Sequence, residues 1–226
     1  MHIAEGFLPP VQAAAWTIAA APFVLHGARA VVREIRERPE SRLLLAAAGA
    51  FTFVLSAIKL PSVTGSSSHP TGTGLGAVLF RPPVMAFLAT VVLLFQALLL
   101  GHGGITTLGA NAFSMAVVGP WAAYGAFRLT RRAGLLPAVF VAMMVADLAT
   151  YCMTSVQLAL AFPDASTGIL GAMVKFLSVF AITQIPLAVI EGLVGVVVFR
   201  VLLSVAKPEL TKLGVLGGKR KESADV

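Results

Sequence analysis

Charged residues are scarce in this sequence. Asp, Glu, Lys and Arg together make up 12% of its 226 residues, whereas 58% are hydrophobic. Ordinary soluble domains carry about 25% charged residues, and a domain of this size cannot bury so much apolar surface. The mean hydropathy of +0.89 and the long uncharged runs therefore predict an all-α integral membrane protein.

Cysteine and the common catalytic motifs are also missing. The single cysteine, Cys152, excludes an internal disulfide and a thiolate metal cluster. The chain has no Walker A motif, no G-x-S-x-G and no H-E-x-x-H, so nucleotide hydrolysis, a serine nucleophile and that type of zinc protease have no residues to carry them. We expect no catalytic residues and no resident cofactor in this chain.

The few charges and the helix breakers divide the chain into membrane spans. From Pro82 to Phe127 there are 46 consecutive residues without a formal charge, which is too long for one span and must be broken at the glycines of GHGG, residues 101–104. A polar loop, residues 61–74, separates two apolar segments. The spans expected on this basis are 9–30, 43–58, 83–101, 106–127, 134–160 and 168–205.

Three clusters of basic residues set the topology. Cytoplasmic ends of membrane helices are rich in Lys and Arg, and all three clusters share one face if residues 73–81 form a seventh, short span beside an inward-folding loop. This arrangement places 15 of the 17 Lys and Arg at the cytoplasmic face. It predicts one transmembrane domain over 1–206, a flexible basic cytoplasmic tail over 207–226, and an N-terminus outside a prokaryotic inner membrane.

The N-terminus has the chemistry of a metal chelator. We expect no cleaved signal peptide, and retention of Met1 because His2 is large. The Met1 amine, the His2 amide nitrogen and the His2 imidazole can then close two fused rings around one ion. Planar nitrogen donors select Cu(II) or Ni(II), with Co(II) a neighbour, and His69 is the candidate fourth donor. The alternative is that His2 is a solvated terminal residue and His69 a loop histidine bonded to backbone.

Several polar residues are candidates to support these ligands. His102, which lies between glycines, either caps a helix end or donates a hydrogen bond to a ligand. Asn111 and Ser68 are further supporting candidates, with Ser68 expected to hold the backbone of His69. Glu5 is the only carboxylate that the sequence places close to the proposed ligands.

Two acidic residues fall inside predicted spans, where ionisable groups are costly. Asp147 and Glu191 can each pair with a cation or accept hydrogen bonds from helix backbone. Four isolated intramembrane charges, including Lys59 and Lys175, do not make a proton relay.

Three motifs carry a family resemblance over nearly the whole chain to about residue 200. MHIAEGFLPP, LSAIKLPSVTGSSSHPTGTGLGAVLF and LLFQALLLGHGGITTLGANAFSMAVVGP, in this order, resemble the substrate-binding membrane subunit (S component) of cobalt and nickel energy-coupling-factor transporters. The resemblance implies a seven-helix bundle with an extra N-terminal helix. It also implies a square-planar site formed by the Met1 amine, the backbone and side chain of His2, and His69. Ser67 departs from the family pattern, which commonly has cysteine there; we expect metal binding to survive.

The resemblance further implies partners: a transmembrane coupling subunit, two cytoplasmic ATPases of the ABC type and, in many systems, a small accessory membrane subunit. The net charge of +7 belongs to the cytoplasmic face, so no nucleic-acid partner is expected. The function expected is capture of Co(II) at the outer face for ATP-driven uptake that feeds cobalamin biosynthesis, with Ni(II) as the alternative ion. An intramembrane metalloenzyme and a stand-alone secondary metal transporter are the rivals from other classes.

Overall fold

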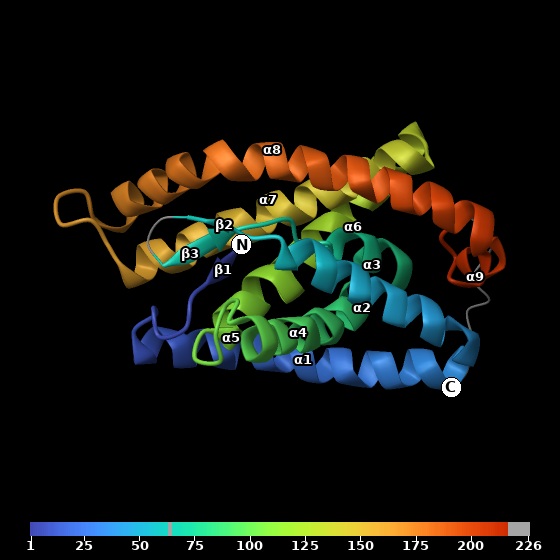
Figure 1. Ribbon diagram of the computed structural model, residues 1–226, viewed down its shortest axis with the longest axis horizontal. Helices are drawn as coiled ribbons and strands as arrows, with labels where there is room; N and C mark the ends of the chain where they lie inside the picture. Colours follow the sequence, from blue (N-terminus) through green and yellow to red (C-terminus); the bar gives the residue numbers. More distant parts are fainter. Residues whose placement is uncertain (63–64, 217–226) are drawn as a thin grey trace.

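The computed structural model describes residues 1–62 and 65–216 and is mostly helical. Within these residues, five helical segments are long and apolar enough to cross a membrane, and they follow the long axis of the molecule (Figure 1). They are α1 (Pro10–Glu37), the short helix η1 (Pro39–Ser41) continuing into α2 (Arg42–Ala57), α4 (Pro82–Leu100), α7 (Leu135–Ala161) and α8 (Gly168–Val205).

Two shorter helical regions complete the bundle. The helix α3 (Thr73–Phe80) coincides with the short segment expected at 73–81. The segment expected at 106–127 is formed by α5 (Leu108–Asn111), one π-helical stretch η2 (Ala112–Val118) and α6 (Gly119–Thr130), followed by the short helix η3 (Arg131–Ala133). Every segment predicted to be a span is therefore helical, and five of them meet the length and hydropathy required for crossing.

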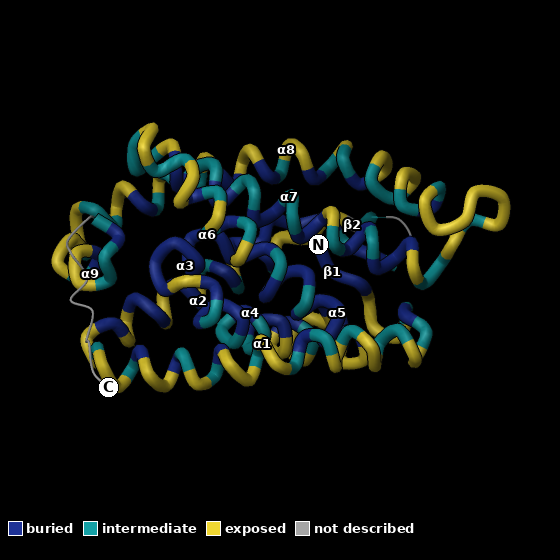
Figure 2. The backbone as a smooth tube through the Cα atoms, turned by 180° about the vertical axis from the view of Figure 1, so that it is seen from behind, coloured by how far each residue is buried: buried dark blue, intermediate teal, exposed yellow. Residues whose placement is uncertain are grey.

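The outer surface of the long helices is apolar. Exposed large hydrophobic residues recur along α1 and α8, among them Val11, Ile18, Leu170, Ile182 and Val197. Figure 2 shows that many exposed residues lie along α1 and α8, whereas buried residues lie in the interior. An apolar exterior on helices of this length is the surface that lipid covers, and the chain is a multi-pass membrane protein.

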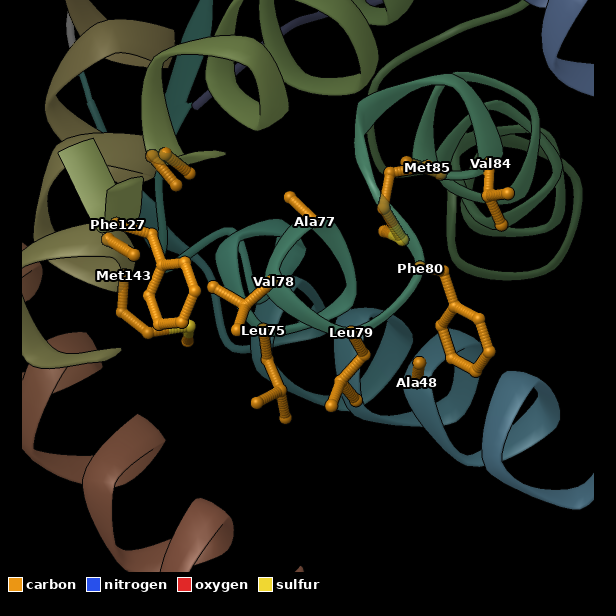
Figure 3. Packing of buried hydrophobic residues seen from close by; sticks show 14 of the residues in the cluster. Ala48, Leu75, Ala77, Val78, Leu79, Phe80, Val84, Met85, Phe127 and Met143 are labelled. Carbon is orange, nitrogen blue, oxygen red and sulfur yellow. The ribbon is translucent and has the colours of Figure 1, made fainter. Parts of the chain in front are cut away.

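The centre of the bundle is α3, all eight residues of which are buried. Its side chains contact neighbouring helices on several sides, with Leu79 and Phe80 in the same cluster as Ala48 of α2, and Val78 in the same cluster as Met143 of α7 (Figure 3). The residues just before it, Ser68–Thr71, are also buried. The predicted inward-folding loop is thus confirmed: irregular backbone reaches the interior because protein surrounds it.

The sequence analysis missed a small β-sheet. Strand β3 (Ser66–Ser68) lies between β1 (His2–Ile3) and β2 (Leu60–Pro61) and is antiparallel to both. The register pairs His2 with Ser67 and Ile3 with Ser66. Strands of two or three residues leave no alternating pattern to detect, yet this pairing brings the N-terminus into the bundle.

Basic residues from each of the three clusters, among them Arg38, Arg131 and Lys212, lie at one end of the bundle in the described part of the chain, and we call this the basic end. Arg131 donates a hydrogen bond to the Val215 carbonyl, and Lys212 forms an ion pair with Glu40 at 2.9 Å. The helix α9 (Lys207–Lys212) packs here through the fully buried Leu210. Packed structure thus continues through residue 216, past the domain boundary expected at 206, and the rest of the predicted tail, 217–226, lies outside the described residues.

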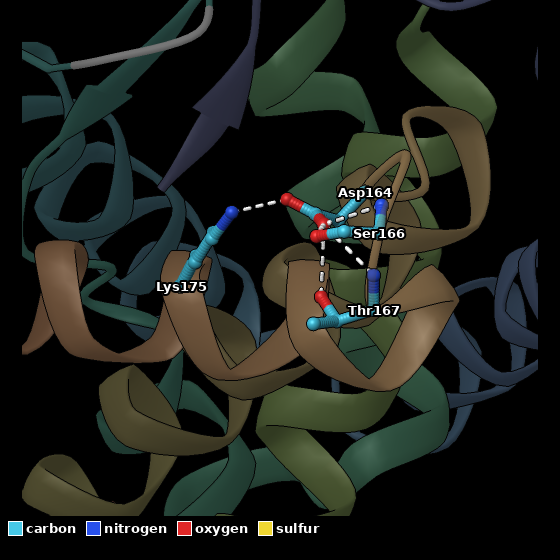
Figure 4. Close-up of polar contacts among 4 residues, drawn as sticks. All are labelled: Asp164, Ser166, Thr167 and Lys175. Carbon is cyan, nitrogen blue, oxygen red and sulfur yellow. Dashed lines mark hydrogen bonds and ion pairs between the residues drawn. The ribbon is translucent and has the colours of Figure 1, made fainter.

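The opposite end carries the turn between α7 and α8, in which Asp164 pairs with Gly168 through two backbone hydrogen bonds. One carboxylate oxygen of Asp164 accepts hydrogen bonds from the backbone and side chains of Ser166 and Thr167, and the other binds Lys175 (Figure 4). These contacts fix the connection between α7 and α8 by local polar interactions.

Candidate metal centre

The N-terminal segment lies between strand β3 and the short helix α5. On one side β1 pairs with β3. On the other side Asn111 accepts a hydrogen bond from the Ile3 amide at 2.8 Å and donates one to the Ile3 carbonyl at 3.0 Å. Thr107 also donates to that carbonyl, at 2.9 Å. The prediction that Asn111 supports the ligands thus has a structural basis, because it fixes the residue next to His2.

The GHGG turn lies against the same segment. Glu5 donates its backbone N–H to the Gly103 carbonyl at 3.1 Å. A Cβ added at Gly104 would lie 2.2 Å from a carboxylate oxygen of Glu5 and 2.5 Å from its Cα. Glycine is therefore required at this position to let the two backbones approach, and this approach brings His102 beside His2.

Three imidazoles meet in the interior. The ring centroid of His2 lies 4.2 Å from that of His69 and 4.4 Å from that of His102, and all three residues are buried. One nitrogen from each ring can be chosen so that all lie within 4.8 Å of one another. The structure thus brings together His2 and His69, as predicted, and adds the His102 ring directly to the group.

The two ring nitrogens of His69 differ in their hydrogen bonding. Its Nδ1 lies 2.8 Å from the Pro70 carbonyl oxygen, and its Nε2 is buried without a hydrogen-bond partner in the described part of the chain. Since a carbonyl only accepts, Nδ1 carries the hydrogen and Nε2 keeps its lone pair. Both readings of His69 from the sequence thus meet in one ring: it binds backbone through one nitrogen, which orients the other as a donor to a metal.

His102 contacts a ligand candidate directly. Its Nε2 lies 3.1 Å from Nδ1 of His2 and 2.9 Å from the Ser67 hydroxyl. Two nitrogens bound to one ion at right angles, with bonds of about 2.0–2.1 Å, are about 2.9 Å apart. Nε2 of His102 is therefore close enough to contact an ion chelated by His2, and its role as a supporting residue stays a prediction.

Met1 is fully buried at the same place. Its side chain belongs to an apolar cluster with Leu158 and Phe180. Its amine interacts electrostatically with His2, His69 and His102. The Met1 amine, which belongs to the residue bonded to His2, is therefore buried together with the three imidazoles.

Burial keeps these donors in their neutral forms. It lowers the pKa of the Met1 amine to about 5, the pKa of His102 to about 4, and the pKa values of His2 and His69 well below the usual histidine range. The cause in each case is loss of water around the charged form. A neutral amine and neutral imidazoles are the forms that bind transition metals.

The contacts of Ser68 and Glu5 differ from those expected. Ser68 is buried, but its hydroxyl contacts the hydroxyl of Thr183 on α8 at 2.9 Å, so it anchors β3. Glu5 is exposed and accepts a hydrogen bond from the Thr106 amide. The expectation that Glu5 is the only nearby carboxylate is wrong, because Asp147 and Glu191 both interact electrostatically with the Met1 amine.

Sequence reasoning missed Met115 and the contact made by Ser67. The Met115 sulfur lies 3.3 Å from Nε2 of His2, the nitrogen that faces away from His102. Met115 lies within the long uncharged run and in η2, so nothing in its local sequence separates it from the apolar residues around it. Ser67 is the residue that departs from the family pattern, and its hydroxyl makes a hydrogen bond with His102.

Together, the apolar helices and the buried group of nitrogen donors define a class: multi-pass membrane proteins that handle transition-metal ions. The chain belongs to the CbiM family, described as the cobalt uptake substrate-specific transmembrane region, which it matches over residues 2–210. It is therefore a component of a cobalt-uptake transporter, in agreement with the resemblance found in the sequence.

Relatives and solved structures agree with this assignment. The cobalt transport protein CbiM of Streptomyces coelicolor is 69% identical, with 99% of each chain covered. That of Propionibacterium freudenreichii is 65% identical, covering 100% of this chain and 97% of the relative. A crystal structure of a truncated transition metal transporter superposes with a TM-score of 0.71 at 28% identity, covering 90% of this chain and 99% of that chain.

Proposed function

We propose that this chain is the subunit that captures Co(II) for an ATP-driven importer of the energy-coupling-factor type. The observation that carries the proposal is the convergence of the Met1 amine, His2 and His69 in a buried site. The ligands are the amine, the amide and imidazole nitrogens of His2, and Nε2 of His69. His102 and Asn111 hold the chelating residues in place.

The metal follows from the donors. Nitrogen ligands favour late divalent metals over Mg²⁺, Ca²⁺ and Mn²⁺. A square plane of nitrogens suits Ni(II), whereas the relatives named above are cobalt transport proteins. We assign Co(II) as the transported ion, with Ni(II) as the competitor against which the site is to be measured.

The proposed topology has seven spans, with α3 short and α5, η2 and α6 together forming one. The N-terminus and the α7–α8 turn face outward, and the basic end faces the cytoplasm, which accords with the positive-inside rule. The ATPases, the coupling subunit and any accessory membrane subunit are separate chains. In this scheme the imported cobalt supplies cobalamin biosynthesis.

Replacing His2 with alanine tests the site. The substitution removes the imidazole that closes the second chelate ring, and it leaves the chain length and the Met1 amine unchanged. We expect stoichiometric Co(II) binding by the purified protein to disappear, while the native chain binds Co(II) at least as tightly as Ni(II). Unchanged binding in His2→Ala would withdraw the N-terminal ligands.

Transport is tested in cells with the partner subunits present. Cobalt uptake should stop when the ATPase subunits carry a substitution of their nucleotide-binding lysine. Uptake that persists in those cells would instead favour a stand-alone secondary transporter.

A further inference from the structure

A buried carboxylate on α7 has no hydrogen-bond partner. Asp147 is fully buried, and both of its carboxylate oxygens lack a partner among the described residues. Glu191 on α8, equally buried, is satisfied: it accepts hydrogen bonds from the Thr71 amide, the Thr71 hydroxyl and the Gly72 amide at 2.5–2.9 Å. Of these two buried acidic residues, Glu191 is thus hydrogen-bonded and Asp147 is not.

The position of Asp147 relates it to the metal centre. Glu191 binds the Thr71 and Gly72 amides that follow His69. Asp147 directly follows Ala146, whose carbonyl oxygen would lie 3.2 Å from a Cβ added at Gly119, with the Thr73 hydroxyl at 3.5 Å from the same point. One turn further along α7, the Thr150 hydroxyl lies 3.4 Å from the carbonyl oxygen of Ser114, the residue before Met115, which contacts His2. This part of α7 therefore packs against the end of the inward-folding loop and against η2, and the Met1 amine interacts electrostatically with both carboxylates. Both amide atoms of Gln184, next to the residue that anchors Ser68, are also without partners among the described residues.

A buried, unpartnered carboxylate is costly, and proteins retain one where a cation compensates it. The candidate ligands are an amine, a backbone amide and imidazoles. Even with the amide ionised, these ligands leave a divalent ion with a net positive charge. A positive charge enclosed by apolar helices needs a negative charge nearby, and the Asp147 carboxylate is buried without a hydrogen bond in the described part of the chain.

We propose that Asp147 is the residue that compensates the charge of the bound metal ion. It acts as a positioning residue through the electrostatic field at the Met1 amine and the ion, and not as an additional ligand. This inference rests on the proposed function. Glu191 has the different task of fixing the loop that carries His69, because its oxygens are already occupied.

The decisive variant is Asp147→Asn, which removes the charge and keeps the shape. The test uses the full chain in lipid nanodiscs with its native N-terminus. Co(II) affinity is to be measured by competition with a chromogenic chelator, and the thermal unfolding of the metal-free protein is to be measured separately. We expect the dissociation constant to rise about 10- to 100-fold, in the range found for residues that support metal ligands. The metal-free variant should unfold at the same or a higher temperature, because neither oxygen of Asp147 makes a hydrogen bond within the described residues that the substitution would break.

Two further variants separate charge from structure. Asp147→Glu restores the carboxylate and should bind Co(II) within a few-fold of the native chain. Glu34→Gln removes a buried carboxylate at the basic end, where Glu34 pairs with Arg38 at 2.8 Å, and should leave Co(II) affinity unchanged. Loss of both affinity and thermal stability in Asp147→Asn would indicate a structural role and overturn the proposal, as would an affinity within twofold of the native value.

The failure of this inference differs from failure of the proposed function. If the native chain binds Co(II), His69→Ala does not, and Asp147→Asn binds like the native chain, then the metal site stands and only the role of Asp147 falls. If the native chain itself binds no Co(II), the proposed function falls.

Discussion

The basic end and the buried histidine region of this molecule use polar residues in opposite ways. At the basic end, side-chain charges are paired near the surface, as with Arg33 and Glu37 at 3.1 Å, whose side chains are 78% and 56% exposed. Around the histidines, polar groups are buried and the four predicted nitrogen donors are neutral. Exposed ion pairs contribute little to stability, whereas buried polar groups need definite partners. Under the proposed function, the basic end serves orientation in the membrane and the histidine region serves recognition of the ion.

Replacing His69 with alanine should have the largest effect on this contrast. The substitution removes the free Nε2 and leaves the other ligands in place, so Co(II) binding measured by equilibrium dialysis should fall about 100-fold or more, since each metal–nitrogen bond contributes strongly. The matched control is His26→Ala, because His26 is exposed and lines a groove beside Arg29 and Arg81 at the basic end. A comparable loss of Co(II) affinity in His26→Ala, or unchanged affinity in His69→Ala, would contradict the assignment of metal binding to the histidine region.

Much of this contrast could be predicted from sequence. The charge clusters and glycine breaks identified the long helices and α3, the latter because the positive-inside rule required one more crossing, whereas α9 lies in the segment expected to be a flexible tail. His2 and His69 were identified because their donor chemistry is local. The β1–β3 pairing, Met115 and the position of Asp147 could not be identified, since each depends on contacts between residues more than 60 positions apart, which no periodicity records.

Asn111→Ala should have an intermediate effect that sharpens the same comparison. The substitution leaves the buried Ile3 amide without its acceptor, at a cost of about 1–3 kcal/mol. Because Ile3 follows His2 directly, we expect both a lower unfolding temperature and weaker Co(II) binding. A matched control is Gln96→Ala, whose buried amide instead binds Phe53 and Ser56 on α2.

The control should lower stability without weakening Co(II) binding, because Gln96 supports packing between α2 and α4. Equal losses of affinity in the two variants would mean that general stability, and not the hydrogen bonds that hold the N-terminal segment, sets the binding strength.

The smallest effect is expected at the exposed α7–α8 turn. Lys175 is the largest cause that holds the pKa of Asp164 well below its usual range, followed by the Ser166 hydroxyl. A carboxylate with a lowered pKa stabilises the turn above its ordinary pKa of about 3.9, and this contribution is lost as pH falls through the folded-state value. In Lys175→Met the carboxylate should protonate at a higher pH, so the turn should open earlier during acidification.

Hydrogen exchange of the Ser166 and Thr167 amides, which donate to Asp164, measures this opening. Near neutral pH, exchange in Lys175→Met should be faster by about fivefold at most, the equivalent of one ordinary hydrogen bond. Co(II) affinity should not change, since the contacts of this turn are local and its ion pair is exposed. If the Lys175→Met substitution weakened Co(II) binding, the turn would be coupled to the metal centre, and the division between exposed charges that orient the chain and buried polar groups that recognise the ion would have to be redrawn.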